Sequence, residues 1–353
     1  MRLRDLYRGE TTFDFMAMRQ RWFTVSAIVL GISILSLIFL RLDGSVDFTG
    51  GTIVDAPNTA AASVSDFRDD LADIGRSGAR VQVTGSGSDG RVLVQTEALD
   101  AADQDELVAT VAGAAGVTID DTNVDAVGPT FGAEITRRAV EALVIFLVVV
   151  AIFISWRFEW KMAAGALAAL FHDLLITAGI YSVVGFEVTP ATVIAVLTIL
   201  GYSLYDTVVV FDKITENVRE LANRNTFTEI ANLSMNQVLM RSINTSLTTL
   251  LPVGSLLLIG SYFLGAATLR EFALALFIGV AAGTYSSIFI ATPLLTLWKE
   301  REPEWQRMQR RAARRSGSSP VVVAVGAAAP ETAAESRDMG AVPKAPRQRR
   351  KRR

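Results

Sequence analysis

Residues 200–212 read LGYSLYDTVVVFD and continue an apolar run that begins at Val188. This run predicts a membrane-spanning helix, because a span needs about 20 mostly apolar residues. Asp206 falls inside it, where a carboxylate costs about 2.5–3.5 kcal/mol on insertion scales. Such a residue normally faces a bundle interior or a water-filled path, where it pairs or carries protons. The alternative is a residue that reaches the helix end, since Asp212 follows closely.

Further apolar stretches of spanning length occur along the chain, half of whose 353 residues are apolar. They predict six membrane helices, at Trp22–Leu40, Ala142–Trp156, Met162–Phe186, Val188–Phe211, Ser242–Leu269 and Phe272–Trp298. The first run is 19 residues long and no small-x-small cleavage pattern follows it. We therefore expect an uncleaved anchor rather than a signal peptide.

Charge is distributed unevenly between the loops. Lys and Arg collect before the first helix, in the turn between the second and third, in residues 213–241 and after the last helix. Residues 43–135 instead hold 17 acidic and 4 basic side chains. Because basic loops stay in the cytoplasm, we expect both termini there. The predicted division is a cytoplasmic segment 1–21, helix 22–41, an extracytoplasmic α+β domain 42–136, helices 2–6 within 137–300 with a cytoplasmic loop 213–241, and a basic tail 301–353.

The acidic domain shows alternating and helical patterns in the order βαββαβ. Strands are predicted at 51–55, 80–84, 91–95 and 119–127, and helices at 63–74 and 102–114. This order predicts a ferredoxin-like fold between the first two membrane helices. The domain shows no nucleophile–base pair and no metal cluster, and the chain has no cysteine. We expect partner contact rather than an enzyme, with no metal and no cofactor.

The end of the chain has a composition typical of disorder, because Ala, Pro, Ser and Gly dominate residues 316–353. A basic cluster closes it. Contact with anionic membrane lipid and simple reinforcement of the topology are equally consistent with this cluster. No aromatic residues are interleaved, so nucleic-acid binding is not expected.

Three further polar residues accompany Asp206 in the predicted spans: His172 and Asp173 in the third helix, and Arg241 at the start of the fifth. Antiparallel packing of helices four and five would bring Arg241 level with Asp206. A guanidinium there favours the ionised carboxylate, and protonation would release the pair. Asp173 is a less secure proton-pathway candidate, since hydroxyls of a neighbouring helix suit it equally. His172 serves either a structural hydrogen bond or a proton relay.

Five segments in order resemble a known family: Val46–Gly51, Phe171–Asp173, Gly201–Ile214, Arg241–Ser246 and Ile278–Ile288. Across residues 10–300 the chain resembles the SecD/SecF family of the bacterial protein-export apparatus, which is related to resistance-nodulation-division transporters. Beside the charged residues, the matching motif positions are Asp47, Phe48, Gly50, Gly51, Gly201, Tyr202, Ser203, Thr207, Asp212, Gly279 and Gly283. Gly201, Gly279 and Gly283 are also expected to let helix backbones approach closely.

The resemblance implies a heteromer with a SecD subunit in the bacterial plasma membrane. It also implies that the proton motive force assists unfolded preproteins as they leave the SecYEG channel. By motif, the family's proton-passage aspartate and arginine correspond to Asp206 and Arg241. The chain departs from the family at Tyr205, where Asn is common.

Other classes of protein fit less well. A half-size exporter of lipid or small molecules of the same superfamily is the main alternative. An intramembrane aspartyl protease lacks support, because the Gly-x-Gly-Asp motif is absent. A membrane-anchored binding module would need only one span. ATP hydrolysis is not expected, since the chain has no phosphate-binding loop.

Overall fold

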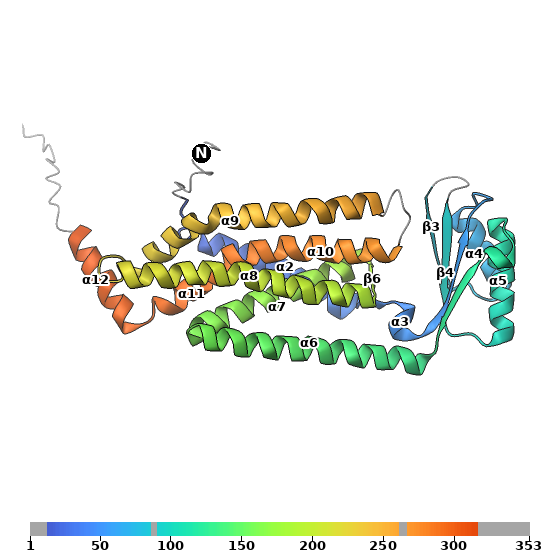
Figure 1. The fold of residues 1–353 in the computed structure, drawn as a ribbon, viewed down its shortest axis with the longest axis horizontal. Coiled ribbons are helices and arrows are strands. Elements are labelled where there is room, and N and C mark those ends of the chain that lie inside the picture. The colour runs from blue at the N-terminus through green and yellow to red at the C-terminus, as the bar shows by residue number, and fades with distance from the viewer. Residues whose placement is uncertain (1–12, 86–89, 261–266, 317–353) are drawn as a thin grey trace, which may run out of the picture. The chain divides into compact units, whose positions relative to one another are not determined.

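The computed structural model describes residues 13–85, 90–260 and 267–316. The predicted disordered segment beyond residue 316, with its basic cluster, lies outside these residues. The six predicted membrane helices are confirmed as long, apolar helices (Figure 1). They are α2 (Arg19–Phe39), α6 (Pro129–Arg157), α7 (Trp160–Val184), α8 (Pro190–Leu221), α9 (Phe227–Ser255) with the π-helical η3 (Leu256–Gly260), and α10 (Ala267–Ser286) continued by the π-helical η4 (Ser287–Ala291) and α11 (Thr292–Lys299).

The helix ends carry the residues that helix ends require. Thr189 and Thr226 cap α8 and α9, each in a reciprocal capping box. Pro190 occupies the first turn of α8, where no intrahelical donor is needed. Gly185 ends α7 with a φ of 74°, a left-handed conformation that glycine adopts without steric cost. The turn between α7 and α8 is therefore tightly specified.

The segment predicted as a loop, 213–241, is mostly helical, because only residues 222–226 are non-helical there. The charged residues suggested a loop, but α8 and α9 run on and bury Ile214 and Phe227. The Phe227 ring lies 5.1 Å from that of Trp305, between ring centroids. Trp305 belongs to α12 (Pro303–Ser316), so the predicted tail begins with a helix.

Small residues bring the central helices together. A side-chain carbon at Gly283 of α10 would lie 2.8 Å from Cβ of Ser203 on α8, and one at Gly279 would overlap Ile199. These two glycines therefore face α8 at close range, as small residues do between membrane helices. Gly201 differs, because no described atom outside its own helix backbone lies within 4 Å of the position a Cβ would take. Within the described part of this chain, Gly201 therefore makes no close helix contact, and its predicted role stays a prediction for packing against a partner subunit.

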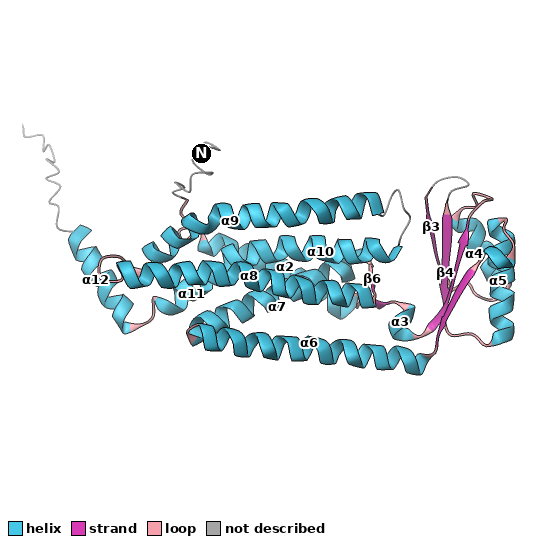
Figure 2. Cartoon of the chain, viewed as in Figure 1, coloured by secondary structure: helices cyan, strands magenta, loops and turns pink. Residues whose placement is uncertain are grey.

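An α/β domain is inserted between α2 and α6. It comprises β2 (Gly51–Pro57), α4 (Val64–Asp73), β3 (Arg80–Thr84), β4 (Arg91–Thr96), α5 (Ala101–Ala115), the 3-10 turn η2 (Ile119–Asp121) and β5 (Asn123–Val127). The sheet has the spatial order β3-β4-β2-β5, with every neighbour antiparallel. Helices α4 and α5 contact each other and pack on β3 and β2 (Figure 2). The last strand starts later than predicted, because Thr118 caps the turn at Ile119.

A short junction connects this inserted domain to the membrane helices. It consists of β1 (Asp43–Gly44), which pairs in parallel with β6 (Glu187–Val188), and α3 (Val46–Thr49), which packs on α6. The motif residues Asp47 and Phe48 lie in α3, Gly50 caps its end, and Gly51 begins β2. A side-chain carbon at Gly50 would lie 2.8 Å from Cα of Pro129, and the φ of Gly50 is 79°. The motif is thus explained by backbone packing at the junction.

Candidate functional site

The carboxylate of Asp206 lies between three helices and is only 6% exposed. Its Oδ1 accepts a 2.7 Å hydrogen bond from the Ser242 hydroxyl of α9. Its Oδ2 has no hydrogen-bond partner within the described part of the chain. One turn further on, Ser246 donates to the Ser242 carbonyl and lies 2.7 Å from the Thr284 hydroxyl of α10. A carboxylate held this way can take up and release a proton.

Arg241 does not pair with Asp206, contrary to the prediction. Among the described residues its Nη2 donates a 2.7 Å hydrogen bond to the Tyr205 hydroxyl, and its guanidinium lies 5.7 Å from the Tyr205 ring centroid. Successive helical residues point about 100° apart, as 3.6 residues per turn requires. Ser242 therefore faces the buried Asp206, while Arg241 faces Tyr205 on the exposed side. The Tyr205 hydroxyl supplies the acceptor for this arginine.

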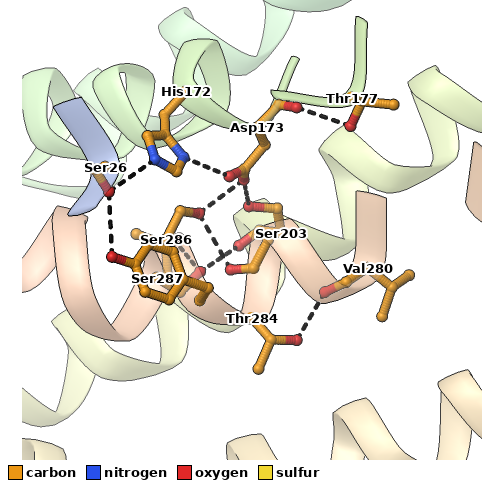
Figure 3. Close-up of polar contacts among 12 residues, drawn as sticks. Ser26, His172, Asp173, Thr177, Ser203, Val280, Thr284, Ser286 and Ser287 are labelled. Carbon is orange, nitrogen blue, oxygen red and sulfur yellow. Dashed lines mark hydrogen bonds and ion pairs between the residues drawn. The ribbon is translucent and has the colours of Figure 1, made fainter. Parts of the chain in front are cut away.

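A second buried polar cluster surrounds Asp173, which is fully buried (Figure 3). Its Oδ2 accepts hydrogen bonds from Ser203 of α8, at 2.6 Å, and Ser286 of α10, at 2.8 Å. Its Oδ1 lies 3.2 Å from Nδ1 of His172. The other ring nitrogen of His172 lies 3.1 Å from the Ser26 hydroxyl of α2. The cluster therefore joins four membrane helices through one carboxylate and one imidazole.

The π-helical segment η4 adds a third set of hydroxyl contacts. Ser287 donates a 3.2 Å hydrogen bond to the Ser203 carbonyl (Figure 3). Its hydroxyl also lies 2.8 Å from that of Thr207. Asp173 lies on α7, but its donor Ser203 precedes Asp206 by about one turn of α8. The two buried carboxylates are therefore associated with neighbouring turns of α8. In the described residues no continuous line of hydrogen bonds connects them. Single π-helical turns are frequent at functional sites.

The predicted site residues lie in several separate places in the structure. Asp206 and Asp173 occupy the two buried clusters, with Ser203 and Thr207 between them. Tyr202 accepts a 3.1 Å hydrogen bond from Thr249 on α9. Asp212 is exposed and pairs with Arg157 at 2.7 Å, outside both clusters.

Sequence reasoning missed two direct partners of the carboxylates, Ser242 and Ser286. It also missed Ser26, which contacts His172, and Ser287, which contacts Ser203 and Thr207. The hydroxyl-rich stretch after Arg241 was the only local signal for one of them. Within the described residues, no group of three or more His, Asp or Glu side chains is placed to hold a metal ion.

The chain is similar to known proteins in sequence and in fold. Residues 108–301 match the family model described as protein export membrane protein SecD/SecF, C-terminal. The protein translocase subunit SecF of Streptomyces coelicolor is 42% identical over 338 residues, which is 95% of this chain and 88% of the relative. The corresponding subunit of Mycobacterium tuberculosis is 43% identical, over 90% of this chain and 74% of the relative.

A solved structure has a similar fold. The crystal structure of SecDF, a translocon-associated membrane protein from Thermus thermophilus, superposes with a TM-score of 0.75 at 33% identity. The match covers 83% of this chain but only 39% of that chain. This chain thus spans about two fifths of the length of the solved SecDF polypeptide. The chain belongs to the SecD/SecF family of protein export membrane proteins, among relatives named as SecF subunits.

Proposed function

We propose that this chain is the SecF-type half of a SecD–SecF membrane complex that uses the proton motive force to assist the export and release of preproteins. The observation that carries the proposal is the Asp206 carboxylate, buried between α8, α9 and α10 with one oxygen unpaired. An ionised carboxylate in such a place is held by few donors and is therefore costly. Protonation removes that cost and changes what the group bonds to.

Arg241 is the second element of this switch. At the Tyr205 hydroxyl it lies outside the buried cluster, one residue from the serine that binds Asp206. A charged Asp206 attracts the guanidinium inward, whereas a neutral Asp206 leaves it with the phenol and the ring face. The proton then selects between two positions of Arg241. Because α8 and α9 each carry one partner of both contacts, their packing differs between the two states.

The proposal extends to topology and partners. The charge asymmetry of the loops supports cytoplasmic termini and an extracytoplasmic inserted domain in a bacterial plasma membrane. The strand order β3-β4-β2-β5 with two helices supports a ferredoxin-like, split βαβ fold for that domain. Large apolar side chains on α2 and α6, such as Ile38 and Ile152, are exposed in the single chain. These faces suit membrane lipid and a SecD subunit that supplies the other six helices.

Within this proposal the chain is a transport subunit rather than an enzyme, and it needs neither cofactor nor nucleic acid. Its further partners are the SecYEG channel and the unfolded preprotein. The acidic inserted domain has edge strands β3 and β5. Edge strands carry unpaired backbone groups, which suits brief contact with extended polypeptide by strand addition.

The test is gradient-driven release of an exported protein from vesicles that contain the complex and the channel. Asp206→Asn, which mimics the protonated form, should keep the complex assembled and lose the gradient-dependent stimulation. Asp212→Asn is the matched control, because Asp212 lies on the same helix but is exposed and paired with Arg157. Release is also measured with a sodium gradient at constant pH in place of the proton gradient, which shows which ion drives the stimulation. Full stimulation in Asp206→Asn would exclude this residue as the switch.

A half-size exporter of lipid or small molecules is the second candidate. In its favour is an apolar cleft of about 290 Å³ between α6, α7 and α8, lined among others by Val140, Leu143, Tyr181 and Val193. A cleft with such a lining suits an acyl chain. Transfer of a fluorescent lipid by vesicles containing only this chain, unaffected by an added channel or preprotein, would favour this candidate.

A further inference from the structure

Glu187, in the turn between α7 and α8, contacts two strands of the inserted domain. The residue is only 5% exposed. Its Oε2 accepts a 3.1 Å hydrogen bond from the Gln95 amide on β4. Its Oε1 lies 3.0 Å from Nη1 of Arg80 on β3, an ion pair whose atoms are not aligned as a hydrogen bond. Side chains of the inserted domain thus bind a carboxylate that lies in the turn between two membrane helices.

Arg80 makes further contacts on the same side. Its Nη1 lies 3.3 Å from Oδ2 of Asp43, and its Nη2 donates a 3.1 Å hydrogen bond to the Gly185 carbonyl. Asp43 and Glu187 are register partners in the small parallel sheet of β1 and β6. One guanidinium therefore binds the segment that follows α2, the end of α7 and the start of β6.

Helix α10 contributes a weaker contact beside these. Arg270 donates a 3.3 Å hydrogen bond to the Gln82 side chain on β3, and it lies 4.0 Å from the carboxylate of Glu271. Glu271 is 7% exposed, and its carbonyl accepts a 2.9 Å hydrogen bond from Tyr181 on α7. The charged groups packed around Glu187 are therefore Arg80 and Asp43 from the domain and junction, and Arg270 and Glu271 from α10.

The covalent connections of the domain lie on the other side of its sheet. The chain enters at β2, after Gly50, and leaves from β5 into Pro129. In the order β3-β4-β2-β5, these two strands occupy the half away from β3. Arg80 and Gln95 hold the β3–β4 half, which has no direct chain connection to the membrane helices. Without them, the contact of Arg270 with Gln82 is the side-chain hydrogen bond that remains to this half among the contacts described above.

An open cavity of about 570 Å³ lies between the two attachments. It is lined by Gly50 and Pro129 from the covalent side and by Arg80, Gln95 and Glu187 from the other. Residues on both sides can therefore approach or separate without displacing a packed apolar core. The ion pair is also open to solvent on the cavity side, since Arg80 is 41% exposed.

We propose that the contact of Arg80 with Glu187 is the latch that transmits rearrangements of α7 and α8 to the inserted domain. The proposal rests on the transport function above, for which it supplies two positioning residues. When α7 and α8 repack, the turn that carries Glu187 moves with them. An intact ion pair then moves the β3–β4 half of the domain, while a broken pair leaves it to pivot about β2 and β5. Loss of Arg80 also leaves Glu187 buried with only a neutral donor, which is unfavourable.

The latch is tested by distance measurement on the complete complex. The chain contains no cysteine, so spin labels attach only at introduced positions. Asp69→Cys on α4 and Val184→Cys on α7 place one exposed label on each side. We expect a narrow distance distribution in the parent chain and a broad one in Arg80→Gln and in Glu187→Gln. Arg91→Gln is the matched control, because Arg91 pairs with Asp55 inside the domain, at 2.6 Å. It should leave the distribution narrow.

Gradient-driven release is then measured for the same variants. We expect loss of stimulation in Arg80→Gln and normal stimulation in Arg91→Gln. An unchanged distance distribution in Arg80→Gln would overturn the latch, and so would a broadened distribution with full stimulation. Failure of the proposed function is separate from both, because the parent chain itself would then show no stimulation while the distance measurement still reports on the contact.

Discussion

The hydroxyl of Ser242 on α9 donates a 2.7 Å hydrogen bond to the Asp206 carboxylate on α8, and the residues just before them, Arg241 and Tyr205, form a second contact of 2.7 Å. The first contact is buried and the second is exposed. The same two helix turns thus carry a protonatable group on the inside and a permanent cation on the outside. In the proposed switch, a change in one contact alters the helix packing that positions the other.

Removal of the Ser242 hydroxyl should destabilise the protein. In Ser242→Ala the ionised Asp206 loses its hydrogen-bonding side chain, and a hydrogen bond to a charged group contributes about 1.5–3 kcal/mol. We expect the free energy of unfolding in detergent to fall by about that amount. Ser255→Ala is the control, since Ser255 is exposed and, within the described part of the chain, donates to the Leu251 carbonyl of its own helix. Equal losses in the two variants would contradict a special role for the Ser242 contact.

Replacement of Arg241 should affect transport more than stability. Its contact with Tyr205 is exposed, so Arg241→Lys and Arg241→Met should each change the free energy of unfolding by about 0.5 kcal/mol or less. Lys keeps the positive charge but lacks the planar guanidinium group, so we expect partial gradient stimulation in Arg241→Lys. Met is uncharged, so we expect no stimulation in Arg241→Met. Unfolding curves and vesicle release assays check both. Full stimulation in Arg241→Met would show that no cation is needed at this position.

The membrane helices were predictable because the physical requirement is strong and local. A span must be long, apolar and internally hydrogen-bonded, and these properties appear in the sequence as uninterrupted runs. The strands and helices of the inserted domain were also predictable, because apolar residues recur every second position in strands and every three to four positions in helices. The helical extensions of α8 and α9 were not, because their buried residues Ile214 and Phe227 stand among charges, and Trp305, which covers Phe227, is distant in sequence.

The partners of the carboxylates were harder to predict. The sequence places Arg241 and Asp206 at similar depth, but only the rotation of α9 about its axis decides whether Arg241 or Ser242 faces inward. That rotation depends on packing with α8 and α10, which no local pattern encodes. Ser26 is similar, because one serine among the apolar residues of α2 gives no indication that it lies 3.1 Å from His172.

Gly201 and Gly283 both belong to the matching motif positions, but replacement by alanine should change the stability of the protein in opposite directions. Gly283→Ala forces a carbon to within 2.8 Å of Ser203 Cβ, so we expect a loss of about 1–3 kcal/mol in stability, typical of overpacking. Gly201→Ala has open space outside its own helix backbone and a helical position, so stability should be unchanged or rise by about 0.5–1 kcal/mol. Thermal unfolding of the two variants in the same detergent compares them. A destabilised Gly201→Ala would indicate a partner surface at that position.

Substitutions at Asp173 separate a structural role from a transport role. Asp173→Ala leaves Ser203, Ser286 and His172 without their common acceptor, so we expect a loss of about 3–5 kcal/mol, as when one partner of a buried charged network is removed. Asp173→Asn keeps the shape and one acceptor oxygen and should be milder. If the residue is structural, this variant retains gradient stimulation in vesicles. A loss as complete as in Asp206→Asn would instead place Asp173 on the proton path.

Helix α4 of the inserted domain should lose protection in acid. The backbone N–H and the hydroxyl of Ser63 both donate to the Asp66 carboxylate and hold the pKa of Asp66 below its ordinary value of 3.8. Because the pKa of Asp66 is lower in the folded state, its ionised carboxylate contributes fully to stability above pH 3.8. This contribution declines as the pH falls through the pKa that Asp66 has in the folded protein. Hydrogen-exchange protection of α4 amides should therefore be constant near neutral pH and fall below about pH 4.

Asp66→Asn removes the titrating group from this capping box. The variant should show lower α4 protection at neutral pH, since the amide replaces a charged acceptor near the helix N-terminus, and a flatter dependence on pH. Asp70→Asn is the control, because Asp70 lies on the exposed surface of the same helix and outside the box. Hydrogen exchange of the peptide that covers residues 63–75, read by mass spectrometry in the whole chain and corrected for intrinsic rates, compares the three proteins. An acid-induced loss that persists unchanged in Asp66→Asn would assign the effect to another carboxylate of this acidic domain.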